Sequence, residues 1–433
     1  MMMKKIITLT ISVFALTTLA FSQVPQPASP QTKPIAITGA IAHLGNGNVI
    51  QNSIITFDNG KLTLVADATS STIDASKFEI INASGKHIYP GFILPDSELG
   101  LQEIAAVRST RDLNETGSYN PNVRSIISYN TDSELIPTLR YNGILLAQTT
   151  PVGGIISGTS SVVELDGWNW EDAVYKTDDG VHLNWPAFYQ SPRWWMGETQ
   201  IKRNEKYDEQ VRELSNFLAE AKAYAQSTPE VTNLKLEAMK GLFDGTKIIY
   251  IRASLAKEIM SAVQLAQQAG IKRIVLKDGE ESYLVKEFLS ENHIPVILAN
   301  VHRLPTSTDE DIDMPYKLPA LLTKAGITVS LSYSGLQNSR NLPFFAGTAA
   351  AYGLSKEEAL QLITLNAAKI IGIDSSCGTL EVGKDANLFI STGDALDMRS
   401  NHIEYAFIAG RKLNLDGKQQ LLYHRFKEKY GQK

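Results

Sequence analysis

Four apolar runs follow one another in the second half of the sequence: Lys247-Ile248-Ile249-Tyr250-Ile251, Arg273-Ile274-Val275-Leu276, Pro295-Val296-Ile297-Leu298 and Ile327-Thr328-Val329-Ser330-Leu331. Runs of this kind are typical of strands that are buried on both faces, as in a parallel sheet. The segments between them, such as residues 256–268 and 283–292, have apolar residues at the 3.6-residue spacing of a helix. The succession therefore predicts repeated strand–helix units around a parallel sheet.

The same pattern extends upstream of these runs. Further strands are predicted at residues 88–94, 143–149 and 161–165, which brings the total to seven. One more strand between residues 170 and 245 would close an eight-stranded barrel, a fold that takes about 250 residues. We therefore predict an α/β fold with a (β/α)8 TIM-type barrel over residues 90–373.

Both ends of the chain have a different pattern, with short alternating runs broken by turn residues. Strands are predicted at residues 35–38, 53–57, 61–65, 378–388 and 403–411. Asp58-Asn59-Gly60 is predicted to be a hairpin turn, because Asn and Gly tolerate the positive φ that such turns require. A helix is predicted over residues 356–371. We expect residues 34–89 and 374–433 to form a composite β-sandwich module, with the barrel inserted between its two parts.

The N-terminus has the features of an export signal. Lys4-Lys5 precedes an apolar run over residues 6–21, and Ala20-Phe21-Ser22 is a small-x-small cleavage site. The run contains several hydroxyl side chains, which favours a cleaved signal peptide (residues 1–22) over a membrane anchor. A Pro-rich linker is predicted at residues 23–33. We expect a periplasmic or secreted protein with no membrane span in the mature chain.

Composition restricts the possible partners and cofactors. The chain has 433 residues, 43% of them apolar and 20% charged, which is a globular composition. Its net charge is −5 and no basic stripe is present, so nucleic acid is not expected as a partner. A single cysteine, Cys377, excludes a disulfide scaffold and a cysteine-based zinc site. We expect a small-molecule ligand, with a homo- or hetero-oligomer as a possibility.

Two motifs resemble those of the amidohydrolase superfamily, and the similarity is greatest to its imidazolonepropionase-like branch. They are Pro90-Gly91-Phe92-Ile93 and the pair Thr364-Leu365-Asn366-Ala367-Ala368-Lys369-Ile370-Ile371-Gly372 and Gly378-Thr379-Leu380-Glu381-Val382-Gly383-Lys384-Asp385-Ala386-Asn387-Leu388. The resemblance covers residues 34–413. It implies the barrel fold and hydrolysis of amide or other C–N bonds outside peptides. It also implies zinc or a similar ion, held by a His-x-His pair after the first strand, histidines after the fifth and sixth, and an Asp after the last.

This chain departs from the family pattern at each ligand position. The sequence after the first barrel strand is Leu94-Pro95-Asp96-Ser97-Glu98, and the fifth-strand histidine appears as Arg252. The sixth position falls within Lys277-Asp278-Gly279, and the last strand ends Ser330-Leu331-Ser332-Tyr333 without an Asp. Protonated Arg and Lys have no lone pair to offer a metal. We therefore expect a degenerate metal site and no tightly bound cofactor, and an activity that is altered or lost.

The polar residues at the predicted strand ends form the candidate site. The catalytic candidates are Asp96, Glu98 and His302, and the ligand-binding candidates are Arg252, Lys277, Asp278, Asn300, Arg303 and Tyr333. Three interpretations remain open: a charge network that binds a carboxylate-bearing or zwitterionic ligand, a remnant Ca²⁺ or Mg²⁺ site at Asp96, Glu98 and Asp278, or ion pairs that hold the barrel together. The alternative to an enzyme is a non-catalytic protein that binds a ligand or a partner.

Two further features have weaker functional interpretations. His182 is predicted to lie in a loop and His293 at a helix end, so both are expected to be structural. All five tryptophans fall between residues 168 and 195. We favour core packing for this aromatic segment, with a ligand pocket or a protein interface as the alternatives.

Overall fold

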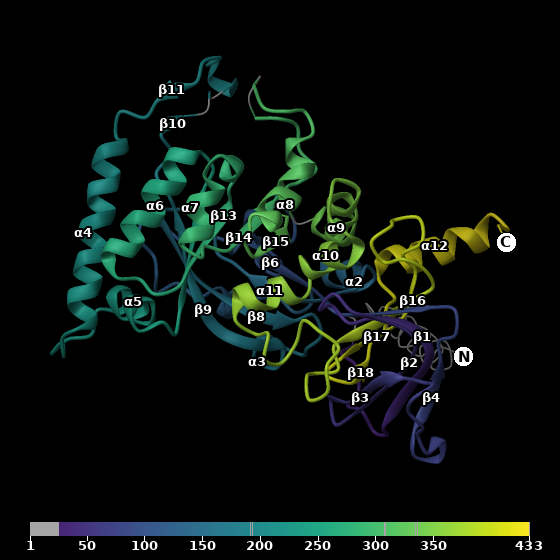
Figure 1. The fold of residues 1–433 in the computed structure, drawn as a ribbon. Helices are drawn as coiled ribbons and strands as arrows, with labels where there is room; N and C mark the ends of the chain where they lie inside the picture. The colour runs from purple at the N-terminus through teal and green to yellow at the C-terminus, as the bar shows by residue number, and fades with distance from the viewer. Residues whose placement is uncertain are drawn as a thin grey trace, which may run out of the picture.

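The computed structural model describes residues 26–190, 192, 194–306, 309–333, 335 and 337–432. The predicted signal peptide, its cleavage site and the first residues of the linker lie outside the described residues. Two eight-stranded sheets form the core of two bodies, a large barrel and a smaller β-rich module beside it (Figure 1). Within the described ranges, no helix combines the length and the hydropathy that crossing a membrane requires.

The barrel sheet has the strand order β15-β14-β13-β12-β9-β8-β7-β6. Its strands are β6 (Phe92–Ser97), β7 (Ile144–Thr149), β8 (Ile156–Glu164), β9 (Val174–Asn184), β12 (Ile248–Ala253), β13 (Ile274–Asp278), β14 (Val296–Ala299) and β15 (Val329–Ser332). The two ends of the sheet meet where Ser332 Oγ of β15 donates to the carbonyl oxygen of Pro95 on β6 (2.5 Å). The result is a nearly closed barrel that contains the four runs with which the strand prediction began.

One strand runs against the predicted parallel arrangement. β8 pairs antiparallel with both β7 and β9, whereas every other barrel pairing is parallel. A parallel connection needs a crossover of a dozen or more residues, and only six residues (150–155) separate β7 from β8. The chain therefore turns back on itself here. A uniform (β/α)8 barrel is the wrong description for this part of the sheet.

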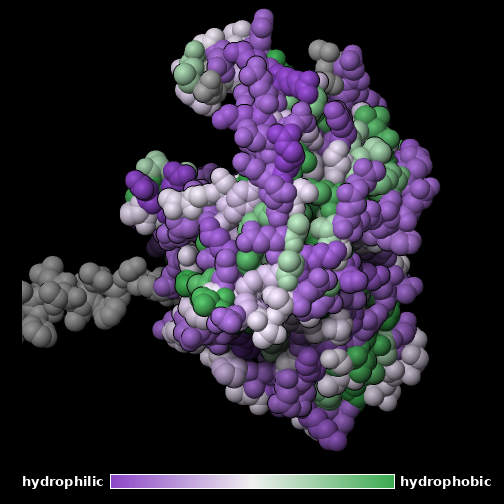
Figure 2. All heavy atoms as spheres, turned by 90° about the vertical axis from the view of Figure 1, so that its left-hand side faces the viewer, coloured by the Kyte–Doolittle hydropathy of each residue, from purple (hydrophilic) through white to green (hydrophobic). Residues whose placement is uncertain are grey.

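Helices cover the outside of the barrel. They are α2 (Leu135–Arg140), α3 (Trp170–Ala173), α4 (Tyr207–Ala225), α5 (Leu234–Asp244), α6 (Ala256–Ala269), α7 (Lys286–Glu291), α8 (Met314–Lys324), α9 (Leu342–Ala351), α10 (Lys356–Gln361) and α11 (Leu365–Ile371). On α4 the buried residues Tyr207, Leu214, Leu218 and Ala221 repeat at helical spacing, which packs one face of the helix inward. Figure 2 shows that the molecular face on this side is mainly hydrophilic.

The helix predicted over residues 356–371 is two helices. α10 begins with a capping box, in which Ser355 Oγ accepts from the Glu358 N–H (3.2 Å) and the Glu358 carboxylate accepts from the Ser355 N–H (2.7 Å). α10 ends at Gln361, and Thr364, directly before α11, has φ −129° and ψ −97°, which is not helical. The periodicity is continuous across this break, so the apolar pattern alone did not reveal it.

Segments from both ends of the chain build the second sheet, in the order β18-β17-β16-β5-β1-β2-β3, with β4 paired to β1. The strands are β1 (Ile35–His43), β2 (Val49–Asp58), β3 (Lys61–Asp67), β4 (Glu79–Asn82), β5 (His87–Pro90), β16 (Leu388–Ser391), β17 (Ile403–Ile408) and β18 (Arg411–Lys412). They form one connected sheet, with β5 paired to β16, around a core that includes Ile37, Phe57 and Phe407. The hairpin turn is as predicted, with φ 49° at Asn59 and 76° at Gly60.

Buried ion pairs join the module to the barrel. Arg411 of β18 lies 2.8 Å from Glu164 Oε2 and 3.0 Å from Asp166 Oδ2. Glu164 is the last residue of the barrel strand β8, and Asp166 follows it. Asp166 also accepts a hydrogen bond from Arg140 of α2 (3.0 Å). The last helix, α12 (Lys418–Lys429), has no buried residue and projects from the body in Figure 1.

Candidate active site

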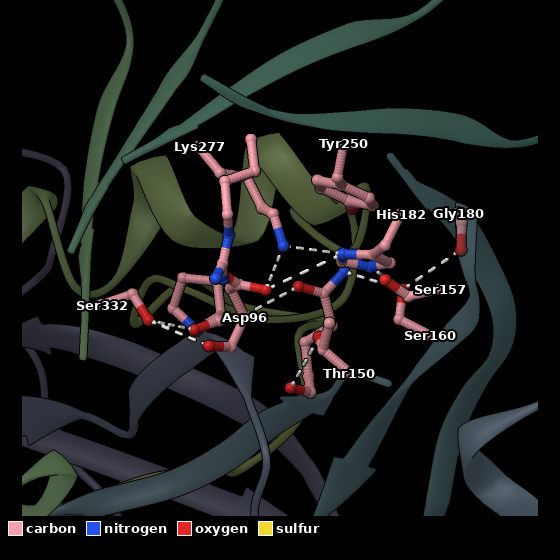
Figure 3. A network of polar contacts seen from close by, with 12 residues as sticks. Asp96, Thr150, Ser157, Ser160, Gly180, His182, Tyr250, Lys277 and Ser332 are labelled. Atoms are coloured by element: carbon pink, nitrogen blue, oxygen red, sulfur yellow. Dashed lines mark hydrogen bonds and ion pairs between the residues drawn. The ribbon is translucent and has the colours of Figure 1, made fainter. Parts of the chain in front are cut away.

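Asp96 is the centre of a polar cluster at the C-terminal end of β6 (Figure 3). Its side chain is 3% exposed and its backbone has φ 50°. The Asp96 N–H donates to Gln148 Oε1 (2.9 Å), and Ser332 Oγ donates to the carbonyl oxygens of Pro95 (2.5 Å) and Asp96 (3.4 Å). These bonds hold the end of the strand in a conformation that residues with a Cβ rarely adopt.

Two cations converge on the Asp96 carboxylate. Lys277 Nζ, from β13, lies 2.5 Å from Oδ1, and Arg252 of β12 lies 3.3 Å from Oδ2. Lys277 is as buried as Asp96, whereas the Arg252 side chain is 35% exposed and also lies 3.3 Å from Asp278 Oδ2. The C-terminal ends of parallel strands share one end of a barrel, which is why residues so distant in sequence meet here.

His182, on β9, extends the cluster inward. Lys277 Nζ lies 2.9 Å from His182 Nδ1, and an ammonium group can only donate, so Nδ1 is an unprotonated acceptor. The hydrogen-bond pattern therefore assigns the proton to Nε2, which donates to Ser160 Oγ (2.8 Å). Burial, and then the charge of Lys277, lowers the pKa of His182 well below its ordinary value, in agreement with a neutral ring. The prediction of a loop position for His182 was wrong.

The network ends on a buried acid, Asp179. Ser160 Oγ donates to Asp179 Oδ1 (2.8 Å), while Tyr250 OH and Gln148 Nε2 each donate to Oδ2 at 2.7 Å. The His182 and Tyr250 rings stack with centroids 4.7 Å apart. Burial raises the pKa of Asp179, although these hydrogen bonds act in the opposite direction. A continuous chain of polar contacts therefore runs from the barrel mouth into its interior.

The pKa values of the carboxyl groups in the cluster are shifted in opposite directions. For Asp96, burial favours the neutral acid, but the charges of Lys277 and Arg252 outweigh it and lower the pKa. Burial raises the pKa of Glu98 and of Asp278, and the nearby charge of Arg252 offsets only part of this effect. Asp96 is thus a fixed anion, whereas Glu98, which is partly exposed and has a raised pKa, accepts a proton more readily than an ordinary carboxylate.

Three strand ends at the mouth have strained backbones. Asp96 is the last residue but one of β6, Asp278 is the last residue of β13, and Asn300 follows β14. Their φ angles are 50°, 68° and 52°. Left-handed conformations of residues other than glycine cost about 1–3 kcal/mol and are concentrated at functional sites. Their occurrence at three strand ends supports a functional role for this end of the barrel.

Other predicted site residues contact different elements. The rings of His302 and Tyr333 both pack against Phe345 of α9, with centroids 4.6 Å and 5.4 Å away. Arg303 forms a two-pronged ion pair with Glu310 at 2.7 Å and 3.2 Å. Burial lowers the pKa of His302. His302 and Tyr333 lie beside α9, and Arg303 lies in the segment before α8. Among the described contacts, none with Asp96 supports the roles predicted for these three residues.

The donor set does not fit the divalent ion that the family resemblance implies. Both Asp96 oxygens face cationic nitrogens, and His182 Nδ1 accepts a hydrogen bond from the Lys277 ammonium. Over the described part of the chain, no three His, Cys, Asp or Glu side chains are grouped so that they could hold a metal. The Lys277 ammonium lies between the Asp96 carboxylate and the His182 imidazole, so the two groups that could bind a metal ion there already contact a cation.

The tryptophans do not behave as one group. Trp185 is 7% exposed and its Nε1–H donates to Tyr207 OH (3.1 Å), so it belongs to the core. Trp168 and Trp195 are 68% and 67% exposed. The side chain of Trp194 lies outside the described part. Core packing is therefore correct for only some members of the segment.

Sequence reasoning missed β9 and with it His182. The signal was present in residues 180–184, where Gly180, His182 and Asn184 alternate with Val181 and Leu183. Such alternation is typical of a strand with one polar and one apolar face. The barrel strands were predicted from continuous apolar runs, and β9 contains no such run.

The polar cluster lies at the C-terminal ends of the strands of a nearly closed α/β barrel, the end at which barrel enzymes have their active sites, and comparisons show which proteins the chain resembles. Residues 202–413 match the model of the amidohydrolase family. This part of the chain, just under half of its length, is therefore similar to the amidohydrolase family. An amidohydrolase from Thermotoga maritima has the same fold, with a TM-score of 0.77 and 24% identity over 88% of this chain and 99% of that one. A zinc-bound adenosine deaminase from Xanthomonas campestris aligns at a TM-score of 0.52 and 14% identity over 94% and 99%.

Curated relatives match over shorter stretches. A 5-methylthioadenosine/S-adenosylhomocysteine deaminase of Moorella thermoacetica is 33% identical over 90 residues, which are 18% of this chain and 20% of that protein. An imidazolonepropionase of Flavobacterium psychrophilum is 28% identical over 153 residues, 31% of this chain and 37% of that protein. The matches thus span between about a fifth and about a third of the relatives' own lengths.

Proposed function

We propose that the protein is an exported hydrolase that cleaves C–N bonds outside peptides in a small molecule, using protein side chains at the barrel mouth in place of the usual metal ligands. The observation that carries the proposal is the Lys277 ammonium, held 2.5 Å from Asp96 and 2.9 Å from His182. The match of residues 202–413 to the amidohydrolase family supports the reaction class. The apolar N-terminal run after Lys4-Lys5 supports export.

The proposed chemistry uses Arg252 and Glu98, two groups of the cluster that solvent reaches. Arg252, with its side chain 35% exposed, donates to the oxygen of the substrate carbonyl as negative charge develops on it. Glu98, whose pKa burial raises, takes a proton from the attacking water. The new C–O bond forms as the carbonyl electrons move to oxygen. The C–N bond then breaks, and the proton returns from Glu98 to the leaving nitrogen.

The buried groups have a positioning role in this scheme. Asp96 and Asp278 each lie 3.3 Å from the Arg252 guanidinium and fix its direction. Lys277 and His182 are 2% and 1% exposed, and each is already engaged in the network, so they act through Asp96 and not on the substrate. For a substrate with a carboxylate, the exposed edge of Arg252 is also the binding group.

Turnover by the purified mature chain (residues 23–433) tests the proposal. Release of ammonia or of a new carboxylate is measured over a panel of cyclic amides and aminated heterocycles, with metal chelators present throughout. We expect activity that survives chelation and falls about a hundredfold or more in Glu98→Gln, the size of a general-base contribution. Glu213→Gln, the same change on the exposed face of α4, is the matched control.

Two results would contradict the proposal. Activity that disappears with chelation and returns with Zn²⁺ would restore a metal-dependent reaction. Binding of panel compounds, detected by tryptophan fluorescence, without any turnover would favour the non-catalytic ligand-binding protein instead.

A further inference from the structure

A pocket of about 360 Å³ lies at the end of the barrel opposite the Asp96 cluster. It is bounded by Ile248, Ile274 and Pro295, at or next to the N-terminal ends of β12, β13 and β14, and by Lys369 and Ile370 of α11. The C-terminal strand ends carry the candidate active site, so this pocket is separate from it. Any ligand here is therefore additional to the proposed substrate.

The charged residues that line the pocket are all basic. Lys272, Arg273 and Lys369 line it together with His293, and no Asp or Glu is among the lining residues. None of these three cations forms an ion pair with a described residue. Arginine remains charged at any physiological pH. A half-buried guanidinium without an acidic partner is unusual, because burial without a counter-charge is costly.

A second cation lies beside Arg273. The position that a Cβ would take on Gly372 is 2.9 Å from Lys176 Nζ and 3.1 Å from an Arg273 guanidinium nitrogen. Both positive groups therefore border the same small space, which exists because Gly372 has no side chain. Lys176 donates to the carbonyl oxygens of Ile371 (2.8 Å) and Gly372 (3.1 Å), which are neutral partners.

Two acids lie near this pair, but neither forms an ion pair with Arg273 in the described part of the chain. Asp179 and Asp374 are the carboxylates whose charges act on Lys176. Asp179 already accepts hydrogen bonds from Tyr250, Gln148 and Ser160. Arg273 therefore lines the pocket without a paired carboxylate among the described residues.

We propose that this pocket binds a small organic anion, with its carboxylate or phosphate group on Arg273 and Lys369. A guanidinium group recognises both oxyanions through two parallel hydrogen bonds. Ile248, Ile271, Ile294 and Ile370 form the floor of the pocket and are at most 6% exposed, so the basic groups supply the surface that a ligand would contact.

Calorimetric titration of the mature chain tests the proposal with three probes: octanoate, inorganic phosphate and uncharged octanol. We expect octanoate to bind and octanol not to bind. Arg273→Gln removes a charge-assisted hydrogen bond and should weaken octanoate binding about tenfold or more. Arg212→Gln, an equal loss of charge on exposed α4, should leave the affinity unchanged.

A second variant covers the case in which Arg273→Gln does not fold. Lys369 is exposed, so Lys369→Gln should fold normally and still weaken octanoate binding. Phosphate binding that is lost in the same variants would assign the pocket to phosphate-bearing ligands. Failure of both anions to bind, equal binding of octanol, or unchanged affinity in both variants would overturn the proposal. None of these results depends on turnover at the barrel mouth.

Discussion

Lys277 Nζ and Asp96 Oδ1 are 2.5 Å apart, and each side chain is only 3% exposed. The two residues are 181 positions apart in the sequence and lie on different strands of the barrel. A buried pair of this kind is stable only while both members are present, because either charge alone would be left in a poorly solvated interior. The pair therefore makes the mouth of the barrel sensitive to single substitutions.

Lys277→Met should destabilise the protein by about 3–5 kcal/mol, since it leaves the Asp96 carboxylate buried without its ammonium partner. Urea unfolding measures the effect. Asp96→Asn keeps a residue that tolerates the positive φ at this position, and it should cost a similar amount. In the double variant the two losses should not add, because no buried charge of the pair remains. Additive losses would show that the contact does not couple the residues.

Added Zn²⁺, Mn²⁺ or Ca²⁺ should not raise the melting temperature of the mature chain. Both Asp96 oxygens are paired with cationic side chains, and a divalent ion would have to displace Lys277 and Arg252. Thermal shift and elemental analysis provide the measurement. Imidazolonepropionase-like proteins with intact ligands serve as positive controls. Stoichiometric transition metal in the purified protein would contradict the expectation.

Stability should fall as the pH drops below about 6.5. Burial lowers the pKa of His182 and of His87, so between the lowered and the ordinary values the unfolded chain binds more protons than the folded one. Stability then rises with pH in this range and is lost as the pH falls through the unfolded value of about 6.5. Melting temperatures between pH 5 and pH 8 follow the effect.

Variants identify the source of this pH dependence. His182→Gln should flatten the curve below pH 6.5, and the remaining slope should come from His87 and His302, whose pKa values burial also lowers. His424→Gln, on the exposed helix α12, should leave the curve as it is in the parent protein. A curve that His182→Gln does not change would exclude the buried imidazole as its source.

Arg411→Met should weaken the attachment of the β-module to the barrel. The Arg411 side chain, 18% exposed, lies 2.8 Å from Glu164 and 3.0 Å from Asp166. Burial already raises the pKa of Glu164 to about 7, and removing the adjacent guanidinium would leave Glu164 without a cationic partner and Asp166 with Arg140 alone. We expect a loss of about 3 kcal/mol in chemical denaturation. Arg399→Met, in an exposed ion pair, should cause no measurable change.

Much of the barrel was predictable because its strands carry local signals. β12, β13, β14 and β15 fall within about two residues of the predicted runs, and α6 (Ala256–Ala269) begins where its periodicity begins. Strands buried on both faces have to be apolar throughout, so the pattern is readable without knowledge of their neighbours. The run at residues 88–94 is an exception. It divides at Gly91 into β5 of the module and β6 of the barrel.

The site was predictable only in part. Position after a strand was enough to select Asp96, Arg252, Lys277 and Asp278, which the structure brings together. It also selected His302, Arg303 and Tyr333, which contact other elements. The end of a strand fixes the position of the backbone, whereas the conformation of the loop that follows decides which groups the side chains of that loop contact.

The sequence by itself determined the repeated strand–helix units and the β-character of both chain ends, because apolar periodicity acts over a few neighbouring residues. Only the tertiary structure decided that β8 runs antiparallel and that His182, 95 residues from Lys277, meets it inside the barrel. Strand direction and register depend on closing the sheet around a shared interior. The partner of a buried charge is therefore chosen by the whole barrel and not by the segment that carries it.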